Sequence, residues 1–155
     1  MFYNSENLET LYIGTGITSL VSNICKIIPK VKTFTLPANI VEIKTSNFVN
    51  ILEMEDFYVK GSAVTAIDSN IFNTHSSSLR LWVPFEGLNY YYSATNWAKM
   101  NSYMIAEKEI AEGETFPTID YSLNWYATIL DATNNTNILT SPTGAGTYYC
   151  KFGIS

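Results

Sequence analysis

The sequence predicts a β-rich fold in which three to four short repeats stack into a solenoid with a parallel strand ladder. A small helical C-terminal cap and an appended antiparallel β segment are predicted to follow. Apolar residues recur every 23 or 24 positions in the first half of the chain. A loosely helical stretch comes next, and the last part is rich in β-branched and aromatic residues between turn-forming segments.

The repeat is visible as three aligned segments, residues 8–13, 31–36 and 54–59, and the offsets are 31 − 8 = 23 and 54 − 31 = 23. Three further apolar columns follow downstream: Ile17, Ile40 and Val64; Leu20, Ile43 and Ile67; and Cys25, Phe48 and Phe72. The third unit is one residue longer than the others, and we assign the extra residue to Gly61. A unit this short cannot bury its own apolar face, so each one needs a stacked neighbour.

Alternation of apolar and polar residues inside each segment predicts one short strand per unit. The side chains expected to point inward are Leu11, Ile13, Phe34, Leu36, Phe57, Val59, Leu81 and Val83, where the last two begin a fourth unit. From Glu86 to Glu109 the spacing of Leu88, Tyr92, Trp97, Met100 and Met104 predicts one or two short helices, which either cap the open end of the stack or are ordinary core packing.

Residues 36–43, Leu-Pro-Ala-Asn-Ile-Val-Glu-Ile, resemble the bacterial surface leucine-rich repeats of the BspA type. The run 81–84, Leu-Trp-Val-Pro, with Tyr91 or Tyr92, Ala94 and Trp97, is similar to the segment that closes such arrays. The resemblance covers roughly residues 7 to 105 and implies a leucine-rich-repeat module for recognition or adhesion. The chain departs from it at Ile24, Asn47 and Ile71, where the family usually has a small residue.

Residues 106–113 are the most charged stretch and predict a linker, which divides the chain into a solenoid with its cap (1–108) and a small β segment (114–155). Residues 118–130 and 148–154 predict three or four strands. Residues 145–150, Ala-Gly-Thr-Tyr-Tyr-Cys, resemble the last strand of bacterial immunoglobulin-like repeats, and this resemblance implies a partial immunoglobulin-like unit. It is too short for a complete sandwich, and its open edges favour a longer parent protein or a homo-oligomer.

The composition argues against several function classes. A net charge of −5 with scattered basic residues gives no electrostatic footprint for nucleic acid. No apolar stretch reaches the length of a membrane span. The single histidine, His75, and the lack of metal-spaced His or Cys pairs predict no enzyme, no cofactor and no metal site. We expect no disulfide between Cys25 and Cys150, because Cys25 falls in a core column.

The candidate ligand-binding surface is the outward side of the strands. Tyr12, Thr35, Tyr58 and Trp82 share one column. The residues that flank it are Thr10, Thr33, Asp56, Arg80 and Lys60. Aromatic and arginine side chains on a rigid sheet suit recognition of a protein or a glycan. The alternative is that these side chains only stack along the ladder.

Two functions remain open. The first is an extracellular or cell-surface recognition module of a larger bacterial protein, in which Tyr58→Ala and Trp82→Ala weaken ligand capture with little change in thermal stability. The second is a bacteriophage virion protein, such as a fibre, decoration or receptor-binding subunit, that docks onto other virion subunits.

Overall fold

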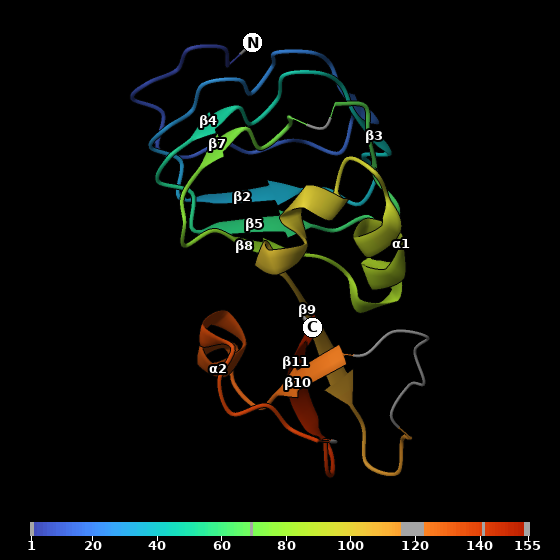
Figure 1. Cartoon of the computed structure of the whole chain (residues 1–155). Coiled ribbons are helices and arrows are strands. Elements are labelled where there is room, and N and C mark those ends of the chain that lie inside the picture. The colour runs from blue at the N-terminus through green and yellow to red at the C-terminus, as the bar shows by residue number, and fades with distance from the viewer. Residues whose placement is uncertain (1, 69, 116–122, 141, 154–155) are drawn as a thin grey trace.

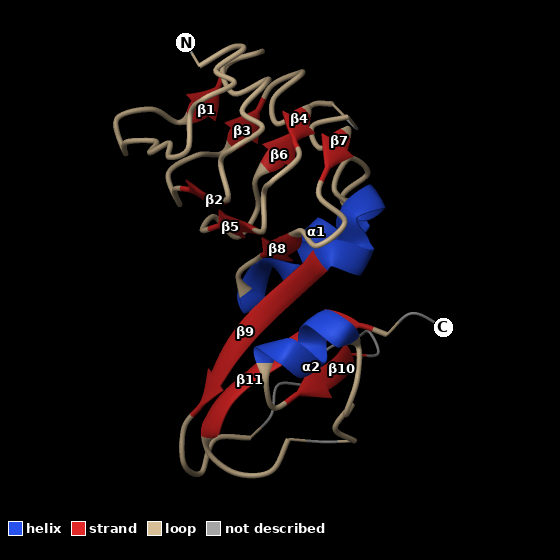
Figure 2. Cartoon of the chain, turned by 90° about the vertical axis from the view of Figure 1, so that its left-hand side faces the viewer, coloured by secondary structure: helices blue, strands red, loops and turns tan. Residues whose placement is uncertain are grey.

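The computed structural model describes residues 2–68, 70–115, 123–140 and 142–153. The fold is β-rich with parallel strand sheets and few helices (Figure 1, Figure 2). The elements in chain order are β1 (Ser19–Leu20), β2 (Thr33–Leu36), β3 (Glu42–Ile43), β4 (Asn50–Ile51), β5 (Asp56–Val59), β6 (Thr65–Ala66), β7 (Thr74–His75), β8 (Arg80–Trp82), η1 (Phe85–Gly87), α1 (Leu88–Ser93), η2 (Ala98–Tyr103), β9 (Met104–Ile110), β10 (Leu123–Tyr126), α2 (Ile129–Asn134) and β11 (Gly146–Phe152).

Successive segments of 23 or 24 residues lie side by side in three parallel ladders, β1-β3-β6, β2-β5-β8 and β4-β7. In the central ladder Phe34 pairs with Phe57, and Phe57 pairs with Leu81. These three side chains are almost fully buried. In Figure 2 the strands of each ladder lie next to one another. The prediction of a parallel strand ladder is therefore confirmed.

The core lies between the ladders and contains a continuous chain of aromatic rings. The Phe34, Phe48 and Phe57 ring centroids are 4.8 to 5.0 Å apart. Phe72 extends the chain to Trp97, whose ring centroid lies 5.8 Å away. Because Phe48 and Phe72 occupy one repeat column, the periodic sequence places a large ring at successive levels of the core after the first, where Cys25 holds that position.

Buried Asn47 shows how the chain accommodates one departure from the resemblance. Its Oδ1 accepts a hydrogen bond from the Cys25 N–H, and its Nδ2 donates to the carbonyl oxygens of Val21 and Lys44. The side chain therefore satisfies backbone groups of its own turn and of the preceding one, which a small residue could not do.

Two details of the predicted repeat are wrong. Residues 8–13 form no strand, and β2 is an edge strand of the described sheet, although Leu11 itself is buried. In the column of Leu20 and Ile43 the third member is Ala66, 7% exposed, whereas Ile67 is 49% exposed. Ile43 to Ala66 is 23 positions and Asn50 to Thr74 is 24, so the extra residue follows Ala66 rather than lying at Gly61.

The predicted helices are present, but they end earlier than expected because Met104 begins β9. Side chains from this region bind the backbone of residues 61–66: the Tyr91 hydroxyl donates to the Gly61 carbonyl and accepts from the Val64 N–H, and Trp97 Nε1 donates to the Val64 carbonyl at 2.7 Å. Asn96 Nδ2 donates to the Ala66 carbonyl. These bonds satisfy backbone groups of residues 61–66. The Tyr91 and Trp97 side chains are also fully buried in the main core, as both the capping and the core-packing interpretations predict.

Strand β9 joins the parallel and antiparallel parts of one sheet. Its first residues pair in parallel with β8 (Leu81 with Met104), and the rest pairs antiparallel with β11 (Ala106 with Cys150). Residues 106–110, predicted as part of the linker, are therefore strand. The physical reason is that Glu107 and Glu109 are exposed while the alternate positions are more buried, so the charged run is one face of a strand. The strand crosses the boundary predicted at residue 108.

The C-terminal part contains β10 and β11 in antiparallel pairing, with helix α2 between them. Residues 129–130, predicted as strand, begin this helix. Thr128 caps it by accepting a hydrogen bond from the Asp131 N–H, and Asn135 ends it in a left-handed conformation. A capping residue followed three positions later by an acidic one is a helix signal that the sequence already contains. Predicted strand residues 118–122 and 154 lie outside the described residues.

Candidate functional site

Three members of the predicted outward column lie in register on neighbouring strands. Thr35 pairs with Tyr58, and Tyr58 pairs with Trp82. Tyr12 is outside the sheet and is 87% exposed. The structure therefore brings together the β2, β5 and β8 members of the column.

Trp82 is covered by the C-terminal part of the chain and is only 8% exposed. It packs with Ile105, Tyr126 and Ala132 in a small second core. Its ring stacks on that of Tyr58 at 5.7 Å and meets Tyr149 edge-on at 6.1 Å. The role of Trp82 is thus largely structural, and the outward face remains open mainly over β2 and β5.

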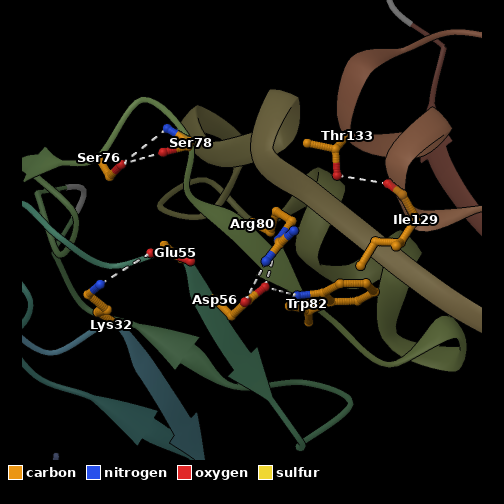
Figure 3. Close-up of polar contacts among 9 residues, drawn as sticks. All are labelled: Lys32, Glu55, Asp56, Ser76, Ser78, Arg80, Trp82, Ile129 and Thr133. Atoms are coloured by element: carbon orange, nitrogen blue, oxygen red, sulfur yellow. Dashed lines mark hydrogen bonds and ion pairs between the residues drawn. The ribbon is translucent and has the colours of Figure 1, made fainter.

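Asp56 joins the two other predicted site residues into one network (Figure 3). Arg80 donates to it through Nε at 2.7 Å and Nη2 at 2.6 Å, and Trp82 Nε1 donates to it at 2.7 Å. The hydrogen bond to Asp56 is the main cause that raises the pKa of Arg80. The Asp56 carboxylate holds both the Arg80 guanidinium and the Trp82 indole. Asp56 and Arg80 therefore orient neighbouring side chains, and their charged groups are mostly occupied by each other.

A groove of about 280 Å³ opens beside the stacked Tyr58 and Trp82 rings. Its wall also includes exposed Lys60, whose Nζ lies 5.1 Å from the centroid of the Tyr58 ring, and exposed Glu107 on β9. Burial, followed by the charge of Asp56, raises the pKa of Tyr58, so its hydroxyl stays protonated near neutral pH and can donate a hydrogen bond. We call this hollow the Tyr58 groove. It combines an aromatic face, an ammonium and a carboxylate.

A second hollow of about 300 Å³ lies between residues 9–12 and strand β2. Tyr12, Thr33 and Thr35 contribute to it. Because residues 9–12 do not pair with β2, this hollow takes the place of the strand that the repeat pattern predicts. Lys60, which the sequence places beside the column, and Glu107, which the predicted site omits, both belong to the Tyr58 groove. Glu107 comes from β9, so no local sequence signal placed it there.

The groups with chemical reactivity lie elsewhere. His75 packs edge-on against Tyr103 at 4.7 Å, and its Nδ1 lies 2.8 Å from the Ser76 carbonyl oxygen. Cys25 and Cys150 are free and buried, and burial raises the pKa of each thiol to about 12. Among the described residues, no three His, Cys, Asp or Glu side chains gather as a metal site. None of the described helices has the length and apolar character needed to cross a membrane.

The chain matches no protein-family model, and neither curated proteins nor solved structures show significant similarity to it.

Proposed function

We propose that this protein is a non-catalytic recognition or adhesion module that binds a glycan or a protein on a cell surface through the outward strand face. In this proposal the parallel ladders are a leucine-rich-repeat solenoid of three to four units, and the module acts outside the cell as part of a larger protein. The 23- to 24-residue register of the ladders supports the solenoid.

The Tyr58 groove is the observation that carries the proposal. It places an aromatic ring, Lys60 and Glu107 around one hollow on a hydrogen-bonded sheet. An aromatic face packs against the apolar face of a sugar ring, while a cation and a carboxylate bind its hydroxyl groups. Because the sheet is already ordered, binding there needs little loss of conformational freedom.

A glycan array, screened with wild-type protein and with Tyr58→Ala, tests this proposal. We expect selective binding by the wild type and a loss of about tenfold or more in the variant. Tyr3→Ala is a matched control, because exposed Tyr3 also lies near a lysine, with Lys26 Nζ 5.7 Å from its ring centroid. Equal binding by Tyr58→Ala and Tyr3→Ala would reject the groove as the site.

The edges of the sheets support a second candidate, a virion structural subunit. Strands β1 and β2 each end a ladder among the described residues, and Ile17 beside β1 is 42% exposed. An open row of this kind favours assembly with another subunit or a second copy. Sedimentation of the purified protein separates the candidates: concentration-dependent assembly favours the virion subunit, and a monomer at all concentrations counts against it.

A further inference from the structure

A third hollow, also of about 280 Å³, lies near the start of β8, between the loop before β8, the end of η2, and elements β11 and α2. Residues with hydroxyl groups from three of these segments line it. They are Ser77, Ser78, Ser102, Tyr103 and Thr133. We call this hollow the Lys151 pocket, after the lysine that also lines it.

Lys151 is only 9% exposed, and its side chain has no hydrogen bond or ion pair with another described residue. It lies on β11 two positions after Tyr149, so both point to the face of the sheet that packs against α2. Burial lowers the pKa of Lys151. The aliphatic stem of Lys151 is buried while its Nζ keeps some exposure to solvent, so the ammonium can bind an anion in the pocket.

The second cation of the pocket is Arg80. Its Nε and Nη2 bind Asp56, which leaves Nη1 as the guanidinium nitrogen outside that ion pair. Figure 3 shows Ser78 and Thr133 on either side of this arginine, and all three line the pocket. Among the described lining residues there is no carboxylate. With Arg80 balanced by Asp56, the ammonium of Lys151 gives the pocket a net positive charge.

We propose that the Lys151 pocket binds a phosphate or sulfate group, either as the free ion or carried on a sugar. Residues with ammonium, guanidinium and hydroxyl groups line one space, and a tetrahedral oxyanion needs such donors from several directions. The Thr133 hydroxyl already donates to the Ile129 carbonyl, so we expect the main contacts from Lys151, Arg80 and the serines. The volume is close to the lower end of small-molecule sites, roughly 300 Å³, so the ligand is no larger than a single sugar with its anionic group. This inference goes beyond the proposed function, because the Tyr58 groove lies at the other end of β8.

The test is an NMR titration of the whole chain with inorganic phosphate and inorganic sulfate at constant ionic strength. We expect saturable shifts of the Ser77, Ser102 and Lys151 amides at millimolar concentrations. Lys151→Met should weaken binding by about tenfold or more, because it removes a charged hydrogen-bond donor. Lys44→Met is the control, because Lys44 is an exposed lysine on the distant β1-β3-β6 side and should leave binding unchanged.

Stability provides an independent readout. Lys151→Met should resist urea at least as well as the wild type, because it keeps the buried apolar stem and removes an ammonium that has no partner among the described residues. A merely structural lysine would give the opposite result, and that loss of stability would overturn the proposal. Ser102→Ala, at an exposed position, should weaken binding severalfold and provides a second test of the pocket.

A phosphorylated hexose and the same hexose without phosphate distinguish the source of the anion. Tighter binding of the phosphorylated sugar than of inorganic phosphate assigns the group to a sugar, and equal binding assigns the free ion. Absence of saturable shifts with every anion, or an unchanged affinity in Lys151→Met, would reject the pocket as an oxyanion site.

Discussion

The indole N–H of Trp82 donates a hydrogen bond to Oδ1 of Asp56, 2.7 Å away on the neighbouring strand. The same carboxylate holds Arg80 through two further bonds. One acidic residue therefore fixes both the ring beside the Tyr58 groove and the guanidinium beside the Lys151 pocket. Substitutions of Asp56 should consequently affect the fold as well as both hollows.

We predict that Asp56→Ala lowers the free energy of unfolding by about 2 kcal/mol, because it leaves the Arg80 guanidinium and the Trp82 N–H without their acceptor. Asp56→Asn should cost less, since the amide oxygen still accepts one hydrogen bond. Urea denaturation followed by tryptophan fluorescence measures both. If the two variants cost the same, the hydrogen bond to Trp82 has no role in stability.

Trp82→Ala should lower the stability by about 3–5 kcal/mol, because it empties part of the second core that contains Ile105 and Tyr126. The expectation from the sequence, that this variant hardly changes thermal stability, is therefore corrected by the burial of Trp82. Tyr58→Ala should cost much less, because that side chain is only partly buried. Thermal unfolding of the two variants side by side checks the order, and a larger loss in Tyr58→Ala would contradict it.

Gly87→Ala should destabilise the fold by about 1–3 kcal/mol, because a Cβ at this position would lie 2.4 Å from the Ser62 carbonyl oxygen. The close approach holds α1 against the turn that precedes β6. Gly14→Ala is the matched control, since nothing lies within 4 Å of a Cβ built there. Chemical denaturation of both variants should separate them clearly, and equal stabilities would mean that α1 is not held in this close contact.

The two cysteines should stay unreactive until the chain unfolds. Burial raises the thiol pKa values from 9.0 to about 12, so the folded state disfavours the thiolate. Because the unfolded thiols ionise first, this contribution to stability is complete below pH 9 and is lost as the pH rises toward about 12. A thiol reagent at mildly alkaline pH should react at the rate of unfolding. Immediate reaction of either thiol in the folded protein would contradict the prediction.

The parallel ladders were predictable from the sequence because strand alternation and repeat period are local patterns. The repeat period alone assigns Phe34, Phe57 and Leu81 to one inward column, and their pairing agrees with it. The shift from Ile67 to Ala66 was not predictable, because an added residue can lie anywhere between two columns that stay in register. Similarly, the charged run on β9 follows a strand pattern only once its partners β8 and β11 are known.

The sequence predicted which residues of the candidate site share one column, but it did not predict which of them are exposed. The register of Thr35, Tyr58 and Trp82 follows from the repeat. The burial of Trp82 depends on a segment more than forty residues later in the chain, where Tyr126 and Ala132 pack against it. A contact at that separation leaves no local signal. Lys151 was missed for the same reason, because only the tertiary fold brings it beside Arg80.

The most direct measurement of the central claim is an NMR map of the site, recorded with the glycan that binds best on the array. Amide shifts should concentrate at Tyr58, Lys60 and Glu107, which line the Tyr58 groove. Tyr58 lies on β5, Lys60 directly follows β5, and Glu107 lies on β9. Residues of the β1-β3-β6 ladder should not move. Shifts confined to that ladder, or none at a saturating concentration of the glycan, would contradict recognition through the outward strand face.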